Sequence, residues 1–285
     1  MNKMIQIVES PRDAMQGISK FISTNKKVDY INRLLKVGYH TVDFGSFVAP
    51  KFMPQMRDSA EVLSNIEIGN SNTKLLSIVA NKRGADLACS FNKIDYLGFP
   101  FSVSEIFQKK NTNKTIDQSL VLVDKIQNLC LSKNKKLVIY LSMAFGNPYG
   151  EKWNNEIVFK WTEKIVNMDI EILSLSDTIG SSDEFSIKSI FRILKNEFSK
   201  VVFGAHFHTK LNNWKEKVES AFSSGCERFD TAIMGYGGCP MVNDKMIGNL
   251  PTEKLITFLN EKKISHNLNL LSFESAYNSA IELFK

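Results

Sequence analysis

The segment KVVFGAHFH, residues 200–208, has the pattern of a buried β-strand that ends in two histidines. Side chains alternate between the two faces of a strand, so His206 and His208 are expected on the same face. Two imidazoles on one face can bind a single metal ion, and this chain places two of its four histidines here. The alternative is a polar strand end with two solvent-exposed histidines.

Seven further segments have the short, β-branched or apolar character of strands that are covered on both faces. They are residues 4–10, 40–47, 74–80, 93–101, 136–143, 170–177 and 228–235. Amphipathic stretches predict helices at residues 27–38, 83–90, 115–134, 154–169, 181–198, 212–225 and 251–263. Doubly wound sheets usually stop at about six strands, whereas repeated strand–helix units in a chain of 285 residues suit a (β/α)8 barrel. The sequence therefore predicts one α/β domain over residues 1–285, a TIM-type barrel with its active site at the C-terminal ends of the strands.

The composition is that of an ordinary globular protein, with 43% hydrophobic and 23% charged residues. The formal net charge is +6, but the lysines are scattered and form no basic stripe with aromatic residues. This pattern argues against nucleic-acid binding and suits an anionic small-molecule substrate.

No apolar run approaches the ~20 residues of a membrane span and no signal peptide is recognisable, so we expect a cytoplasmic protein with no membrane partner. The four cysteines form no CxxC pair, which argues against a disulfide framework or a structural zinc site.

Polar and titratable residues follow most of the predicted strands. They are Arg12 and Asp13 after the first strand, Asp43 and Ser46 at the second, Asn147 and Tyr149 after the fifth, Ser176 and Asp177 at the sixth, His206 and His208 at the seventh, Cys239 after the eighth, and then Asn249. Any one of them could be a cap or turn residue. Together they would gather at the face where barrel enzymes carry out catalysis.

Two further residues complete a candidate metal site around the histidine pair. Asp13 reaches the barrel mouth from the opposite end of the chain, and Asn249 can add an amide oxygen. Two imidazoles, a carboxylate and an amide oxygen leave open positions on an octahedral cation, which suits a substrate-binding divalent ion better than a closed zinc site. Alternatively, Asp13 pairs with its neighbour Arg12 or caps a helix.

Several motifs occur in the order found in one enzyme family. They are PRDAMQ (11–16), SFVAPKFMPQM (46–56), SEIFQKKN (104–111), SLSDTIG (174–180), HFH (206–208), GGCP (237–240) and GNLPTE (248–253). In these segments the chain resembles the 3-hydroxy-3-methylglutaryl-CoA lyase family. The resemblance implies a TIM-like barrel that cleaves 3-hydroxy-3-methylglutaryl-CoA into acetyl-CoA and acetoacetate with Mg²⁺ or Mn²⁺. It also implies a place in leucine degradation and ketone-body metabolism.

The resemblance assigns roles to individual residues. It implies metal binding by Asp13, His206, His208 and Asn249 and catalysis by Arg12, and it matches Cys239 and Asp177 to family positions. Together with the strand-end residues, this predicts a catalytic set of Arg12, Asp13, His206 and Cys239. The predicted substrate-binding set is Arg12, Asp43, Ser46, Ser176 and Asp177. Cys239 belongs to a glycine-rich loop that could fold over the site, although a free loop thiol is the simpler interpretation. The chain departs from the family at Ala14, at Asp43 where a glutamate is common, at Asn147 and at Thr209.

These residues predict a retro-Claisen cleavage of an acyl-CoA substrate. Arg12 would stabilise the enolate, Asp13 would accept the hydroxyl proton, and His206 or Cys239 would protonate the enolate carbon. Lys51, Lys109 and Lys110 could meet the CoA phosphates or could simply be solvated. Three alternatives remain open: a Claisen-type enzyme that condenses acetyl-CoA with a 2-oxo acid, a lyase for another 3-hydroxyacyl-CoA, and a catalytically silent barrel that binds an anionic partner. Barrels of this kind often pair, so a homodimer is possible.

Overall fold

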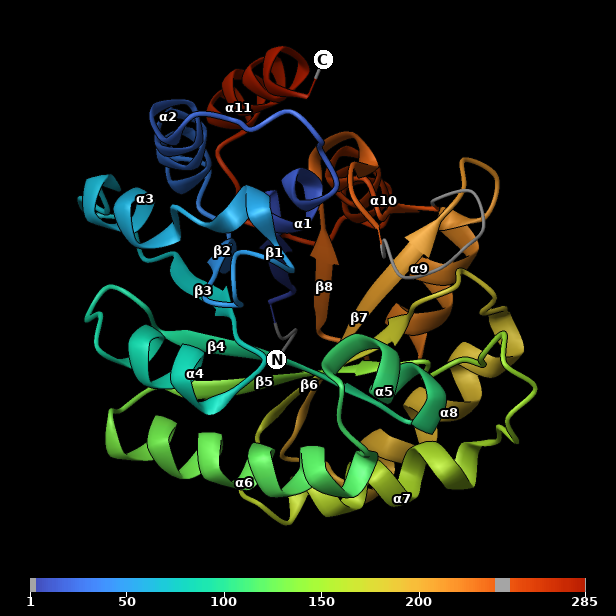
Figure 1. Cartoon of the computed structure of the whole chain (residues 1–285). Helices are drawn as coiled ribbons and strands as arrows, with labels where there is room; N and C mark the ends of the chain where they lie inside the picture. Colours follow the sequence, from blue (N-terminus) through green and yellow to red (C-terminus); the bar gives the residue numbers. More distant parts are fainter. Residues whose placement is uncertain (1–3, 239–246, 285) are drawn as a thin grey trace.

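Eight parallel strands close into a barrel in the computed structural model, which describes residues 4–238 and 247–284 (Figure 1). The strands are β1 (Gln6–Glu9), β2 (Thr41–Ser46), β3 (Lys74–Ile78), β4 (Tyr96–Ser102), β5 (Lys136–Ser142), β6 (Ile172–Asp177), β7 (Val202–Thr209) and β8 (Arg228–Thr231). Each strand pairs with the next, and β8 pairs with β1 to close the sheet. The predicted (β/α)8 barrel is therefore confirmed, and each of the eight predicted strands overlaps an observed one.

Helices surround this sheet. They are α1 (Pro11–Gln16), α2 (Thr24–Leu35), α3 (Ser59–Asn65), α4 (Lys82–Cys89), α5 (Glu105–Thr112), α6 (Ile116–Ser132), α7 (Asn155–Val166), α8 (Glu184–Glu197), α9 (Trp214–Ser223), α10 (Thr252–Glu261) and α11 (Leu270–Leu283), with short 3₁₀ turns η1 (Pro54–Met56) and η2 (Ile233–Gly235). The seven predicted helices are all present. Side-chain caps start several of them: Thr115 and Gln118 form a capping box on α6, and Asn154 caps α7.

The structure adds elements that the sequence pattern did not predict. Helices α1, α3, α5 and α11 lie outside the predicted segments, and α11 packs beside α2 (Figure 1). A two-residue strand, β9 (Gly248–Asn249), pairs antiparallel with the end of β7 and sets Asn249 opposite His208. In the part of the chain that the structure describes, no helix is both long and apolar enough to cross a membrane.

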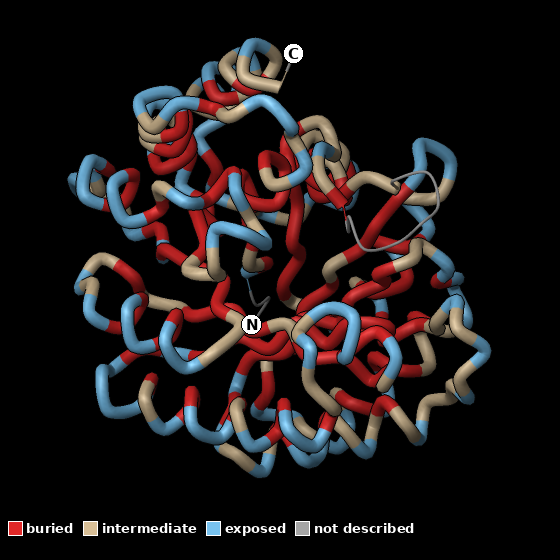
Figure 2. The backbone as a smooth tube through the Cα atoms, in the orientation of Figure 1, coloured by how far each residue is buried: buried red, intermediate tan, exposed pale blue. Residues whose placement is uncertain are grey.

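The inside of the barrel divides into an apolar half and a polar half. The apolar half, from β3, β5 and β6, consists of Leu76, Ile78, Val138, Tyr140 and Ile172. On the opposite half, Asp43 of β2, His206 of β7, and Arg228 and Asp230 of β8 take the interior positions. The larger apolar core lies between the sheet and the helices, so the strands are buried while the outer helix faces are exposed (Figure 2). The charged side chains of the interior thus lie on one side of the barrel.

Candidate active site

A cavity of about 650 Å³ opens at the C-terminal ends of the strands. Arg12 and Asp13, which follow β1, line it together with Ser176 and the histidines of β7. Other lining residues come from the loop at 48–53 and from residues 110–114, at the end of α5 and just after it. The cavity therefore lies where the barrel fold predicts an active site.

The guanidinium of Arg12 bridges two carboxylates beneath this cavity. Its Nε and Nη2 donate to Asp43 Oδ2 at 3.0 and 2.6 Å, and its Nη1 donates to Asp13 Oδ1 at 2.9 Å and to Gln16 Oε1 at 2.9 Å. Burial raises the pKa of Asp43 to about 6, and Arg12 opposes that rise. Burial acts to lower the pKa of Arg12, but the two carboxylates outweigh it and hold this pKa above its ordinary value. Arg12 is therefore a fixed positive charge at the cavity wall.

Asp13 is buried, and Asn249 and Gln16 hold its carboxylate. Asn249 Nδ2 donates to Asp13 Oδ2 at 2.5 Å, and Gln16 Nε2 donates to Asp13 Oδ1 at 2.5 Å. Burial acts to raise the pKa of Asp13, but the charges of Arg12 and His206, with the hydrogen bond from Asn249, bring it below its ordinary value. Asp13 is consequently an anion at neutral pH.

His208 is held as a neutral imidazole with a defined tautomer. Its Nδ1 lies 2.9 Å from the carbonyl oxygen of Thr178, and a carbonyl can only accept, so Nδ1 carries the proton. Burial and the neighbouring His206 lower the pKa of His208 to about 4. The Nε2 atom is left with a lone pair, which is the state that binds a metal ion.

His206 lies beside His208, with ring centroids 5.5 Å apart, and faces Asp230. The distance from His206 Nδ1 to Asp230 Oδ2 is 3.6 Å. Burial acts to lower the pKa of His206, but Asp230 and Asp13 outweigh it and raise this pKa above its ordinary value. The two histidines therefore differ in character, since the pKa of His208 is lowered and that of His206 is raised.

The donor set suits a divalent cation. His208 is fixed through Thr178, and Asn249 Nδ2 also donates to the Tyr236 carbonyl at 2.8 Å, which leaves Asn249 Oδ1 as its ligand atom. Among residues 4–238 and 247–284, however, no three His, Cys, Asp or Glu side chains stand ready-made as a metal cluster. Asp13 is instead engaged by Arg12, Gln16 and Asn249. The structure brings these donors to one wall without closing them into a ligand shell.

The other predicted site residues have varied positions. Ser176 lines the cavity, whereas Asp43 lies behind Arg12 and does not. Ser46 Oγ donates to the Ile78 carbonyl at 3.1 Å and accepts from Val48 N, so it shapes the loop. Asp177 forms a buried ion pair with Lys217 and is also absent from the cavity lining. Cys239 lies outside the described residues.

The sequence analysis missed several residues that support the site. Thr178 and Gln16 orient His208 and Asp13, and Asp230 faces His206. Only Asp230 gave a signal in the sequence, because a charged side chain is unusual inside a buried strand such as the predicted strand 228–235. Lys217 gave no signal, because a lysine on an amphipathic helix normally faces solvent.

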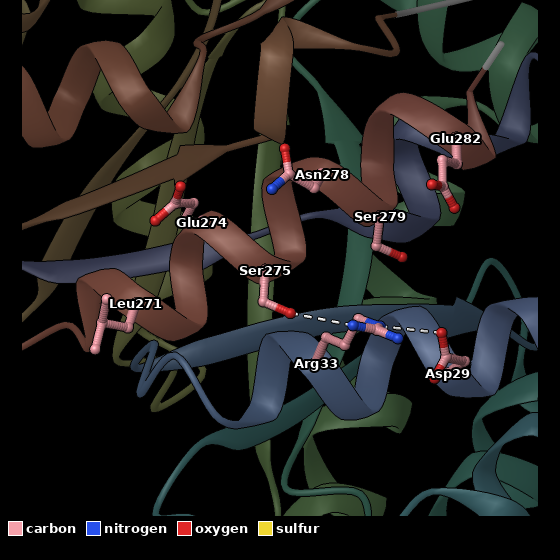
Figure 3. A pocket seen from close by; sticks show the side chains of 8 residues that line it. All are labelled: Asp29, Arg33, Leu271, Glu274, Ser275, Asn278, Ser279 and Glu282. Atoms are coloured by element: carbon pink, nitrogen blue, oxygen red, sulfur yellow. Dashed lines mark hydrogen bonds and ion pairs between the residues drawn. The ribbon is translucent and has the colours of Figure 1, made fainter.

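A second hollow, of about 470 Å³, lies between α2 and α11 (Figure 3). Arg33 occupies it, donating from Nε to Asp29 Oδ2 at 3.0 Å and from Nη1 to Ser275 Oγ at 3.1 Å. Its lining shares no residue with the strand-end cavity and contains no histidine or cysteine. It offers no imidazole or thiol for the predicted chemistry.

Comparisons with known proteins agree with this fold. The HMGL-like family model matches residues 4–279. The hydroxymethylglutaryl-CoA lyase of Bacillus subtilis (strain 168) is 30% identical over 96% of this chain and 91% of its own length, and the mitochondrial enzyme of Homo sapiens is 31% identical over 97% and 84%. The crystal structure of the Bacillus subtilis HMG-CoA lyase superimposes with a TM-score of 0.92, at 30% identity over 99% of this chain and 94% of that one.

A further solved structure is that of an HMG-CoA lyase from Acinetobacter baumannii in complex with coenzyme A and 3-methylmalate. It has a TM-score of 0.91 and 27% identity, and the match covers 99% of this chain and 91% of that one. The fold, the site and these relatives define an enzyme, a carbon–carbon lyase built on a TIM barrel. The chain belongs to the HMGL-like family.

Proposed function

We propose that this protein cleaves 3-hydroxy-3-methylglutaryl-CoA to acetyl-CoA and acetoacetate with the help of Mg²⁺ or Mn²⁺. The observation that carries the proposal is the convergence of Arg12, Asp13, His206 and His208 on one cavity wall. The relatives named as hydroxymethylglutaryl-CoA lyases support the choice of substrate.

The rim of the cavity suits an acyl-CoA thioester. Lys51, Lys110 and Lys114 line it and supply positive charge for phosphate groups. Lys109 instead pairs with Glu105 at 3.2 Å and does not line the cavity. The acyl group would enter toward Arg12, while the nucleotide end stays near these lysines. The coenzyme A complex of the Acinetobacter baumannii relative supports this assignment.

Arg12 is suited to stabilise an enolate. An arginine has five N–H groups, and the hydrogen bonds found among the described residues use four of them. The remaining N–H, on Nη2, can donate to the thioester oxygen as negative charge develops there. Asp43 fixes the plane of the guanidinium, so this donor is aligned before the substrate arrives.

The reaction needs one proton removed and one returned. Asp13 is anionic and accepts the proton of the tertiary hydroxyl. The carbonyl of acetoacetate then forms as the C–C bond breaks, and the bonding electrons pass to the acetyl-CoA fragment as an enolate. His206 or Cys239 returns a proton to the enolate carbon. A divalent cation bound by Asp13, His206, His208 and Asn249 would supply Lewis acidity and orient the substrate oxygens.

An assay of acetoacetate formation by metal-depleted protein tests the proposal. We expect no product until Mg²⁺ or Mn²⁺ is added and full activity with 3-hydroxy-3-methylglutaryl-CoA afterwards. Other 3-hydroxyacyl-CoA esters, and acetyl-CoA mixed with 2-oxo acids, serve as competing substrates. Absence of acetoacetate under every condition, or faster release of free CoA from the condensation mixture, would contradict the proposed reaction.

A single domain over residues 1–285, homodimer formation and a cytoplasmic location remain predictions. Size-exclusion chromatography coupled to light scattering would distinguish a monomer from a pair of 32.3 kDa chains. Limited proteolysis would test the single domain, and fractionation of the source cells would test the location.

A further inference from the structure

We propose that Lys217 is a positioning residue that fixes the tautomer and the orientation of His208. The proposal rests on the proposed function, in which His208 is a metal ligand. It concerns a lysine that lies on α9, outside the cavity lining, and that is only 1% exposed.

The ammonium group of Lys217 makes three hydrogen bonds. Its Nζ donates to Asp177 Oδ2 at 2.5 Å, to the Gly180 carbonyl at 3.0 Å and to the His208 carbonyl at 3.2 Å. An ammonium has three N–H donors, so each donor has one acceptor. This complete pairing compensates for removing the charge from water. The lysine thereby joins the end of β7 to the turn after β6.

The same turn holds the imidazole ring of His208. Residues 177–180 form a turn in which Gly180 N donates to the Asp177 carbonyl at 3.0 Å. The carbonyl of Thr178, within this turn, accepts from His208 Nδ1 at 2.9 Å. His208 is therefore connected to the turn twice, through its ring directly and through its backbone by way of Lys217.

Asp177 anchors the other side of this arrangement. Besides Lys217, its carboxylate accepts from Ser182 Oγ at 2.5 Å and from the backbone N–H of Ser181 at 2.9 Å. These bonds place the turn, and Lys217 holds the turn against β7. Without the lysine, the Gly180 and His208 carbonyls would lose their ammonium partner. Only the β6–β7 pairing, whose register ends at Asp177 and Phe207, would then hold the turn against the strand. The hydrogen bond from His208 to Thr178 depends on the separation between turn and strand.

The consequence for the site is chemical. A fixed Nδ1–H leaves the Nε2 lone pair toward the cavity, and loss of the Thr178 contact would allow the other neutral tautomer, which cannot bind through Nε2. Lys217 touches neither substrate nor cation. It acts through His208.

Nitrogen-15 NMR of the histidine rings in the metal-free protein tests the proposal directly. Wild-type His208 should show one strongly protonated and one unprotonated nitrogen at pH 7, and a His208→Gln variant provides the assignment. In Lys217→Met the two resonances should move toward each other as the tautomers mix. The double variant Asp177→Asn/Lys217→Met removes both charges, so it leaves no unpaired buried carboxylate and should show the same change.

Lys27→Met is the matched control. Lys27 is also a buried lysine, 2% exposed, paired with Asp58 at 2.6 Å, but it lies on α2 and contacts no proposed ligand. This variant should lose stability and leave the His208 resonances unchanged. Titration with Mn²⁺ adds a second readout, in which we expect Lys217→Met to bind about 10- to 100-fold more weakly than the wild type.

The possible results separate the two proposals. Unchanged His208 resonances in the folded double variant would overturn the positioning role even if the wild type binds Mn²⁺. Mixed tautomers in both Lys217 variants, with no change in Lys27→Met, would support it. If the wild type binds no Mn²⁺ while the resonances still move, the metal-dependent function fails and the positioning role of Lys217 stands.

Discussion

Glu9 provides a prediction about stability that can be worked out in full. Its side chain is fully buried at the end of β1, where it accepts hydrogen bonds from Thr252 Oγ1 at 2.5 Å and from Ile233 N at 2.8 Å. Burial raises the pKa of Glu9 to about 8, although these hydrogen bonds oppose the rise. The native state therefore keeps a proton that the unfolded chain releases near pH 4.5.

The sign of the pH dependence follows from this difference. Between about pH 4.5 and 8 the native state binds more protons than the unfolded state, so the free energy of unfolding falls as the pH rises. With those two pKa values, the contribution of Glu9 decreases by about 2.5 kcal/mol between about pH 5.5 and 7.5. Glu9→Gln carries no titrating group at this position and should lack this decrease.

Urea unfolding at several pH values measures the effect as the difference between wild type and Glu9→Gln. Taking the difference cancels groups that titrate in both proteins, such as His208, whose lowered pKa has the opposite effect. The wild type should lose about 2.5 kcal/mol relative to the variant from about pH 5.5 to 7.5. Glu216→Gln, at an exposed position on α9, is the control and should run parallel to the wild type. A constant difference between wild type and Glu9→Gln would refute the reasoning.

Three further predictions concern the active site. Arg12→Lys removes the planar guanidinium that binds Asp43, and with it the N–H proposed to donate to the enolate. We therefore expect kcat to fall about 10²- to 10³-fold in steady-state assays, and an unchanged kcat would contradict the role of Arg12. His208→Gln should abolish Mn²⁺ binding measured by calorimetry, and wild-type affinity in this variant would exclude His208 as a ligand. Lys110→Ala should raise KM for the acyl-CoA several-fold with kcat retained, an effect that shrinks at high salt; a salt-independent KM would argue against phosphate contact.

The fold could be predicted because its signals are local. Strands such as 136–143 and helices such as 115–134 show their periodicity and caps within one segment, and the barrel follows from the number of such units. Helix α11 was not predicted, although it is also one continuous segment of the chain. The face of α11 is covered by α2, a helix far away in the sequence, and this contact cannot be seen within the segment itself.

The site was predicted in part for a similar reason. Residues at or just after the C-terminal end of a strand, such as His208 and Asp13, had to meet once the barrel closed. Their partners depend on register and side-chain direction, which spacing does not encode. The pairing of Asn249 with His208 through β9 and the ion pair between Asp177 and Lys217 are therefore properties of the folded chain. Asp177 shows the difference, because its place at the end of β6 was predicted correctly while its carboxylate faces Lys217 and not the cavity.

Charge balance connects the polar half of the barrel with its proposed chemistry. One run of alternating charges consists of Asp43, Arg12 and Asp13. In it, Arg12 Nη2 lies 2.6 Å from Asp43 Oδ2, and Arg12 Nη1 lies 2.9 Å from Asp13 Oδ1. A second run consists of Arg228 and Asp230, with 3.8 Å between Arg228 Nε and Asp230 Oδ1. Three carboxylates face two guanidinium groups, and His206 lies between the runs. This excess of negative charge explains why the pKa of His206 is raised despite its burial, so that the imidazole holds a proton more strongly. A divalent cation satisfies the same excess, so its binding would displace that proton and should become stronger as the pH rises.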